Sequence, residues 1–474
     1  MLMKFFYNKF SIYIILTIIA FLVRFFLLDG RESWHDEWHS IYVSDPNISF
    51  SETMSRFYGD KGDTTLPEYY PPLYLFILKY AFFVFGYFEH VGRLLSIVAG
   101  SLIIPASIYL SSFFLNKRQS FFLGLLIIFN LFLFWQSAEI RAHSILVLFS
   151  IISIILFIKL LDNKKNLTFV VYYLFSVFVL SLWPIAGAIF FGKTIFIVNK
   201  FFIKKKLELR ILVVFTVILL TYIILNKNYL IYNLARDFHY TLLYDSFFYN
   251  YHFRTFFGSK FLGAIYLLLF VYFLIFNFKK IIFESSNKNL IIYIILSSYF
   301  LTLTYSIFRA SIMSPKYIIF ILPLILIWIT INLSRYKNGV IYSCILTTIT
   351  IIFFALNINN YPMKRPPVTE VLNLIIKDNS KNIIIEDTDV FKNYVKTKKI
   401  FQDYNMLLLE NRNNQEDNVI DIWFICLNNP RYAVGNKKLD DEENCKNFKL
   451  KDLDFSLNYE YKLTDFLLKK YTKN

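Results

Sequence analysis

The chain is dominated by apolar runs that are each long enough to cross a lipid bilayer. A helix that crosses the hydrocarbon core needs about 17–25 predominantly apolar residues, and runs of this length recur from Ser11 to Leu356. Of the 474 residues, 56% are hydrophobic and 18% are charged, whereas soluble domains hold roughly 45–50% apolar residues. The sequence therefore predicts an α-helical polytopic membrane protein, in which lipid solvates much of the surface.

The two ends of the chain differ in character. The first apolar run, Ser11 to Leu28, follows a short basic start that contains Lys4 and Lys9. No small-residue cleavage site precedes the next polar stretch, so this run is expected to be an uncleaved anchor. From Asn357 onward the chain is polar and has no run of spanning length. We therefore expect a transmembrane domain at 1–356 and a soluble domain at 357–474.

Positive charge falls between the apolar runs. A net charge of +16 would suggest a nucleic-acid partner in a soluble protein. Here the cations form short clusters between two apolar runs, as expected for cytoplasmic loops beside membrane lipids. These clusters are Lys117-Arg118, Lys164-Lys165, Lys200 to Arg210, Lys279-Lys280 and Arg335-Lys337. The pattern argues against nucleic acid and indicates which loops face inward.

The segment from Pro71 to Phe88 decides the topology. It is apolar, yet it opens with two prolines and contains Lys79. Counting it as a span would reverse every later loop and place the basic clusters outside, so we expect it to lie in the outer interface. The expected spans are then eleven, at about 11–28, 93–115, 120–136, 144–161, 167–184, 185–199, 211–226, 261–278, 291–307, 318–333 and 340–356.

In this register the loops at 29–92 and 227–260 and the soluble tail face the periplasmic or extracellular side of the plasma (inner) membrane.

The tail is expected to form a small α/β domain. Two apolar runs in it predict buried strands, Ile383-Ile384-Ile385 and Ile422-Trp423-Phe424-Ile425, and a helix-like segment lies between them near 391–399. Cys426 and Cys445 both lie in this tail, where an oxidising compartment would let them form a disulfide, whereas Cys344 lies inside a span.

An acidic pair lies immediately beyond the first span. The segment Ser33 to Ser40 contains Asp36 and Glu37, where the bilayer boundary makes uncompensated charge unfavourable. This placement favours a functional site, although a solvated or helix-capping acidic turn explains such a pair equally well.

Two other motifs suggest different chemistry. His35-Asp36-Glu37-Trp38-His39 is similar to the zinc protease motif His-Glu-x-x-His. Asp36 stands where that motif has glutamate and is one methylene shorter, and no third zinc ligand is evident in the sequence. Only bound zinc in the purified protein would favour a zinc site. Asp387-Thr388-Asp389 resembles the Asp-x-Asp motif of nucleotide-sugar transferases. The tail is small for such a domain, and it is expected on the side where nucleotide sugars are absent.

Five short motifs occur in a fixed order along the chain. They are Ser33-Trp34-His35-Asp36-Glu37, Tyr70-Pro71-Pro72-Leu73-Tyr74, Gly92-Arg93-Leu94-Leu95-Ser96, Ser137-Ala138-Glu139-Ile140-Arg141-Ala142-His143, and Pro315-Lys316-Tyr317 with Pro323. Their order and spacing resemble the GT-C glycosyltransferases, in the group of protein O-mannosyltransferases and lipid A aminoarabinose transferases. Tyr70 stands where that group has histidine, His143 where it has tyrosine, and Lys316 where it has arginine.

The resemblance implies a GT-C fold with juxtamembrane helices and an enzyme that takes sugars from polyprenyl-phosphate donors. It implies that Asp36 is the catalytic base, with Glu37 beside it, because transfer needs a base for the acceptor hydroxyl or amine. The substrate and its departing phosphate are expected to contact Tyr70, Arg93, Glu139, Arg141 and Lys316. A single displacement would invert the anomeric configuration. The sugar, the acceptor (lipid, glycan or protein) and any divalent cation stay open.

Two other kinds of membrane protein would carry different sequence features. A lipid-glycan transporter would carry charged or broken helices at mid-membrane, whereas ionisable residues here are expected at span ends. An O-antigen polymerase or ligase would carry an arginine-rich large loop, and Lys227 to Lys260 offers only Arg236 and Arg254.

Overall fold

The computed structural model divides the chain into two compact units. Unit 1 comprises residues 1–29 and 67–363, and unit 2 comprises residues 30–66 and 364–474. The predicted boundary at 356/357 stays a prediction. The structure describes residues 9–27, 33, 35–58, 71–162, 165–205, 208–235, 247–284, 286–309, 312–358, 368–378, 382–385, 405–408, 421–427, 455–462 and 466–473.

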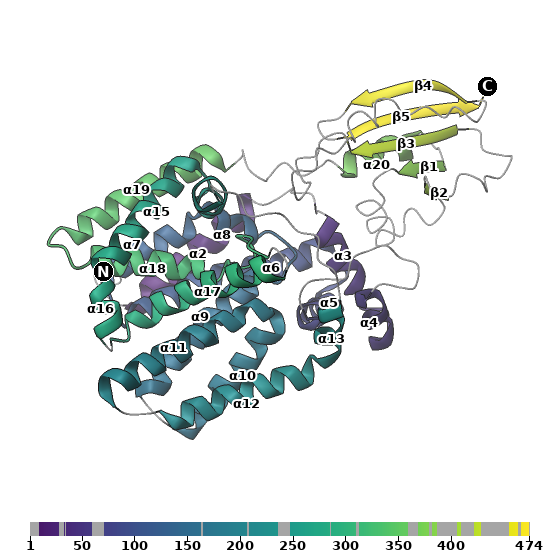
Figure 1. Ribbon diagram of the computed structural model, residues 1–474. Helices are drawn as coiled ribbons and strands as arrows, with labels where there is room; N and C mark the ends of the chain where they lie inside the picture. Colours follow the sequence, from purple (N-terminus) through teal and green to yellow (C-terminus); the bar gives the residue numbers. More distant parts are fainter. Residues whose placement is uncertain are drawn as a thin grey trace. The chain divides into compact units, whose positions relative to one another are not determined.

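Every regular element among the described residues of unit 1 is a helix (Figure 1). Its elements are α2 (Lys9–Leu27), α5 (Leu73–Phe85), α6 (Glu89–Ser111), α7 (Lys117–Ile128), α8 (Leu131–Gln136), α9 (His143–Asp162), α10 (Asn166–Leu182), the 3₁₀ turn η1 (Pro184–Ala186), α11 (Gly187–Lys204), α12 (Leu209–Leu225), α13 (Lys227–Ala235), the π-helix η2 (Phe247–Phe253), α14 (Arg254–Phe257), α15 (Lys260–Phe276), α16 (Phe278–Phe283), α17 (Asn289–Phe308), α18 (Ile321–Leu333) and α19 (Gly339–Asn357).

Several of these helices can cross a membrane. Among the described residues, five are long and apolar enough, namely α6, α9, the stretch Pro184–Lys204, α17 and α19. The number rises to seven if two bent pairs each count as one span: α12 with α13, bent by 77°, and the η2–α14 segment with α15, bent by 105°. The chain is thus suited to multiple crossings, and the number eleven stays a prediction. The expected span at 120–136 is divided at Asn130, whose side chain caps α8 by accepting from the Leu133 amide.

Helix α5 lies within the segment expected in the membrane interface. It has 13 residues, which makes it about 20 Å long, against roughly 30 Å of hydrocarbon. Tyr80, Phe83 and Phe85 on this helix are exposed, and aromatic residues are enriched at membrane–water interfaces. These properties fit the interfacial placement, which stays a prediction.

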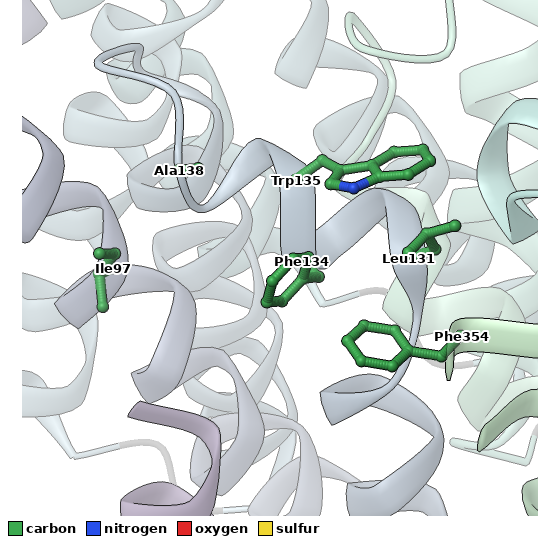
Figure 2. Packing of buried hydrophobic residues seen from close by; sticks show 6 residues of the cluster. All are labelled: Ile97, Leu131, Phe134, Trp135, Ala138 and Phe354. Carbon is green, nitrogen blue, oxygen red and sulfur yellow. The ribbon is translucent and has the colours of Figure 1, made fainter. Parts of the chain in front are cut away.

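A buried apolar cluster fixes α8 within unit 1. It joins Ile97 of α6, Leu131, Phe134 and Trp135 of α8, Ala138 just beyond α8, and Phe354 of α19 (Figure 2). The rings of Phe134 and Phe354 meet edge to face with centroids 5.1 Å apart. Because the cluster holds both α8 and Ala138, it determines where the following segment, residues 137–142, begins.

Unit 2 contains α3 (His35–Val43), α4 (Phe50–Tyr58), α20 (Val368–Lys377) and, in its described part, a five-stranded sheet of order β2-β1-β3-β5-β4. The strands are β1 (Asn382–Ile385), β2 (Asn405–Leu408), β3 (Asp421–Leu427), β4 (Phe455–Lys462) and β5 (Phe466–Lys473). β1 runs parallel to β2 and β3, with Ile384 opposite Phe424, whereas β5 runs antiparallel to β3 and β4. The strands predicted at 383–385 and 422–425 are confirmed.

Other expectations for the tail fall outside the described residues. These are the helix-like segment at 391–399, the motif Asp387-Thr388-Asp389, and Cys445. Cys344 in α19 is exposed and has a free thiol. The disulfide between Cys426 and Cys445 stays a prediction.

Candidate functional site

Helix α3 carries the acidic pair in its first turn. Carboxylates are favourable there because the helix dipole places partial positive charge at the N-terminus. Adjacent side chains on a helix diverge by about 100°, and their environments differ accordingly. Glu37 is 1% exposed, whereas Asp36 is half-buried. Asp36 is therefore the more accessible carboxylate of the pair.

Helix α4 holds the C-terminal end of α3 through Arg56. Its Nη1 donates to the Tyr42 carbonyl oxygen at 3.0 Å, and its guanidinium carbon lies 4.2 Å from the centroid of the Tyr42 ring. Its Nε also pairs with Glu52 at 3.1 Å. These contacts fix α3 within unit 2. Within the described residues of the chain, no three His, Cys, Asp or Glu side chains come together as metal ligands.

In unit 1, the start of α6 is fastened to the segment 137–142. Arg93 donates from Nη1 to the Ala138 carbonyl oxygen at 3.2 Å and from Nη2 to Glu89 Oε1 at 2.6 Å. Next to it, a Cβ on Gly92 would lie 2.7 Å from the Ile140 side chain. Glycine at this position lets α6 approach the segment closely enough for the Arg93 hydrogen bond.

The segment itself gathers acidic and basic groups. Glu139 Oε2 lies 3.8 Å from Nδ1 of His143, the first residue of α9. Arg141, between them in sequence, is 5% exposed. Ser144 Oγ donates to the Gln136 carbonyl oxygen at 3.2 Å, which ties the end of α8 to the start of α9. A carboxylate, a guanidinium and an imidazole thus lie within five consecutive positions.

A row of rings connects this segment to the Lys316 motif. The His143 ring lies 5.6 Å from Trp183 and Trp183 lies 5.5 Å from Tyr317, measured between centroids. Lys316 Nζ lies 6.0 Å from the Tyr317 ring centroid. The structure thereby brings together, within unit 1, the predicted motifs around Arg93, Arg141 and Lys316. Sequence reasoning missed Trp183, although a Trp-Pro step between two apolar runs could have marked it.

The remaining predicted residues divide between the units. Asp36 and Glu37 belong to unit 2. Tyr70 lies outside the described residues, but α5, which follows it, packs on α6 at the same place, since Leu78 would lie 3.1 Å from a Cβ on Gly92. Tyr74, from the same motif, is fully buried.

Comparison with solved structures decides the fold. ArnT from Cupriavidus metallidurans, a lipid A aminoarabinose transferase crystallised with undecaprenyl phosphate, matches with a TM-score of 0.61, covering 96% of this chain and 97% of that chain. Its apo structure matches equally well. The apo oligosaccharyltransferase from Archaeoglobus fulgidus matches with a TM-score of 0.51, covering 82% of this chain and 64% of that chain.

The chain has the GT-C fold. The resemblance predicted from its motifs is confirmed at the level of the fold. Sequence identity is 11% to each of these proteins, so the likeness concerns architecture. No protein-family model and no curated protein matches the sequence.

One buried cation of this GT-C fold corrects the expectation that ionisable residues lie only at span ends. Lys193, within α11, is fully buried. Its Nζ donates to Ser153 Oγ at 2.8 Å, to the Ser153 carbonyl oxygen at 3.3 Å and to Tyr172 Oη at 3.2 Å. The rings of Phe157, Tyr172 and Phe190 lie 4.8–5.3 Å away. An ammonium has three N–H donors, so Lys193 serves as a polar clamp between α9, α10 and α11.

Proposed function

We propose that this protein is a GT-C glycosyltransferase that moves a sugar from a polyprenyl-phosphate donor to a hydroxyl or amine acceptor on the outer face of the plasma membrane. The observation that carries the proposal is the contact, within a GT-C fold, of the segments that bear Arg93, Arg141 and Lys316, through the hydrogen bond from Arg93 to Ala138 and the row of rings from His143 to Tyr317. Support for the donor class comes from ArnT, a structural neighbour that was crystallised with undecaprenyl phosphate. The acceptor is a lipid, glycan or protein of the cell envelope.

The basic residues of unit 1 suit the donor phosphate. When the bond from the sugar to phosphate breaks, negative charge grows on the leaving oxygen, and fixed cations stabilise it. Arg93 already donates to Ala138 and Glu89, so we assign it to positioning the segment 137–142. Arg141 and Lys316 are assigned to the phosphate.

Glu139 is assigned to organising this cationic side. Its carboxylate lies 3.8 Å from His143 Nδ1, and the row of rings through Trp183 links His143 to Tyr317. This row keeps the turn that carries Lys316 beside the segment that carries Arg141. A change at either end is thus expected to disturb the other.

Asp36 is assigned as the base. In the reaction it accepts the proton of the acceptor hydroxyl while the acceptor oxygen forms a bond to the anomeric carbon. The bond between that carbon and the phosphate oxygen breaks, and polyprenyl phosphate leaves with the electron pair. One displacement inverts the anomeric configuration. Glu37, which is almost fully buried, is assigned to orienting α3.

Mass analysis of surface lipids and glycans from cells with and without the protein tests the proposal. Cells that express the wild-type chain should contain one species that is heavier by one sugar. Cells that lack the chain, or that express Asp36→Asn at the same level, should lack it. Identical mass profiles for wild-type and chain-free cells would contradict the assignment as a transferase.

A further inference from the structure

Arg24, near the C-terminal end of α2, is a fully buried cation that belongs to none of the five motifs. Its side chain is 0% exposed and is among the largest fully covered side chains of the described residues. Its Nη1 donates to the Ala20 carbonyl oxygen, one turn earlier in the same helix, at 3.3 Å. Its Nε, also buried, has no hydrogen-bond partner in the part of the chain that the structure describes.

Among the described residues, the guanidinium of Arg24 also lacks a counter-ion. No carboxylate of the described chain forms an ion pair with it. Guanidinium groups stay charged in proteins, and a buried charge without a partner destabilises the folded state. The fold therefore tolerates an unfavourable charge at Arg24, and an anion that bound nearby would offset the energetic cost of that charge.

The surroundings of Arg24 show where its charge acts. Helix α2 packs against α6 at Gly100, where a Cβ would lie 3.4 Å from Arg24 Nε and 2.4 Å from the Cβ of Ser137. Phe21 and Val23, which shortly precede Arg24 in α2, pack on the apolar cluster that includes Ala138. Arg24 thus lies beneath the start of the segment 137–142.

Charged side chains lie in and beside that segment. Arg93 holds it through Ala138, and Arg141 lies within it. Counting only described residues, three guanidinium groups (Arg24, Arg93 and Arg141) face two carboxylates (Glu89 and Glu139) along this part of unit 1. Buried charges are screened far less by water and salt than exposed ones.

We propose that Arg24 supplies a fixed positive charge that strengthens binding of the donor's phosphate group in unit 1. Because Arg24 is covered, it acts on the phosphate through its field and through the segment it supports, as a positioning residue. The inference rests on the proposed function, since it assumes that the anion is the phosphate of a polyprenyl donor. A unit charge about 10 Å away in a medium of effective dielectric about 20 changes affinity roughly tenfold.

The test measures binding of undecaprenyl phosphate and of undecaprenol, its uncharged alcohol, to the full-length chain in phosphatidylcholine nanodiscs by tryptophan fluorescence. The variants are Arg24→Met, Arg24→Lys and Arg24→Gln, the last in case Arg24→Met does not fold. Arg210→Met is the matched control, because Arg210 is an exposed cation elsewhere in unit 1. A parallel series replaces phosphatidylcholine with phosphatidylglycerol, which offers the phosphate of a membrane phospholipid instead.

The proposal expects the dissociation constant for undecaprenyl phosphate to rise roughly tenfold in Arg24→Met and Arg24→Gln, and to stay near the wild-type value in Arg24→Lys and Arg210→Met. Binding of undecaprenol should not change. In addition, Arg24→Met without ligand should melt at a higher temperature than the wild type, because an unfavourable buried charge is gone. A structural role alone would instead lower the melting temperature.

Three results would overturn the inference while leaving the proposed function intact. They are wild-type affinity of Arg24→Met for undecaprenyl phosphate, equal weakening for the phosphate and the alcohol, or an effect seen only with phosphatidylglycerol. A wild-type chain that binds undecaprenyl phosphate no better than undecaprenol would instead overturn the proposed function, and the role of Arg24 with it.

Discussion

Arg93 Nη1 lies 3.2 Å from the carbonyl oxygen of Ala138 and donates a hydrogen bond to it. This bond joins the first turns of α6 to a segment 45 residues later in the chain, and the second guanidinium nitrogen pairs with Glu89 at 2.6 Å. The position of Arg141 in the proposed donor site therefore depends on Arg93, which is itself 9% exposed.

Replacing Arg93 should impair both stability and transfer. Arg93→Met leaves the Ala138 carbonyl without this donor, and an unsatisfied buried acceptor costs about 1–3 kcal/mol. We expect a lower melting temperature and transfer reduced by at least about tenfold, because a displacement of about 1 Å near a reacting centre lowers rates strongly. Arg118→Met, which removes an exposed cation, is the control for loss of charge and should change neither quantity.

Cysteine labelling tests whether the basic loop at 200–210 faces the cytoplasm. In a chain whose three native cysteines are changed to serine, Lys204→Cys should resist an impermeant thiol reagent in intact cells, because basic loops stay in the cytoplasm. Ser51→Cys, exposed on α4, should label readily. Rapid labelling at position 204 would reverse the topology and place α5 across the membrane.

Lys193 should matter for stability more than for chemistry. Lys193→Ala leaves a cavity and removes the donor from Ser153 and Tyr172, at a cost of about 2–4 kcal/mol. Lys193→Met fills the same volume with apolar atoms, and such replacements of buried charges are often close to neutral. In thermal unfolding in detergent, the melting temperatures of the wild type and of Lys193→Met should both be higher than that of Lys193→Ala. Equal loss in both variants would argue that the charge itself is required.

The sheet of unit 2 should lose stability at alkaline pH through Lys470. Burial alone would lower the pKa of Lys470, but hydrogen bonds and charge from Asp378 at 2.6 Å and Asp421 at 3.4 Å raise it above its ordinary value. A lysine whose pKa is raised in the folded state stabilises fully below its ordinary pKa of about 10.5, and this contribution is lost as the pH rises through the raised value.

Pulse proteolysis in urea, following cleavage within unit 2, measures this effect. The urea midpoint of the wild type should fall between pH 8 and pH 11 by more than that of Lys470→Met, with a difference of about 1 kcal/mol. If the urea midpoints of the two proteins fell equally with pH, Lys470 would contribute nothing to the pH dependence of stability.

Much of the architecture could be predicted because apolar run length and motif order are local properties. Apolar runs marked most helices of unit 1, and short isoleucine-rich runs marked β1 and β3. The hairpin of β4 and β5 was missed, although Phe455–Lys462 alternates apolar and polar residues, a pattern typical of a half-buried strand. Phe466–Lys473 carries a weaker signal, because only its first three residues form an apolar run.

The missed residues near the site depend on packing between distant parts of the chain. In the sequence, Arg24 resembles any arginine near a span end, and only the packing of α2 on α6 at Gly100 shows that it is fully buried. Lys193 finds its partners on two other helices, and Trp183 is recognised only once its ring lies between His143 and Tyr317. Such long-range partners are not encoded in the spacing of a single segment.

The most direct test of the account is the transfer rate of Asp36→Asn. The substitution keeps the size of the side chain and one oxygen but removes the base, and a general base contributes about 10²–10⁴ in rate. The purified full-length variant should lose transfer by that factor, with the polyprenyl-phosphate donor that surface mass analysis identifies, while binding the donor almost as the wild type does. Glu37→Gln should be affected less. Near-wild-type transfer by Asp36→Asn would contradict the central claim.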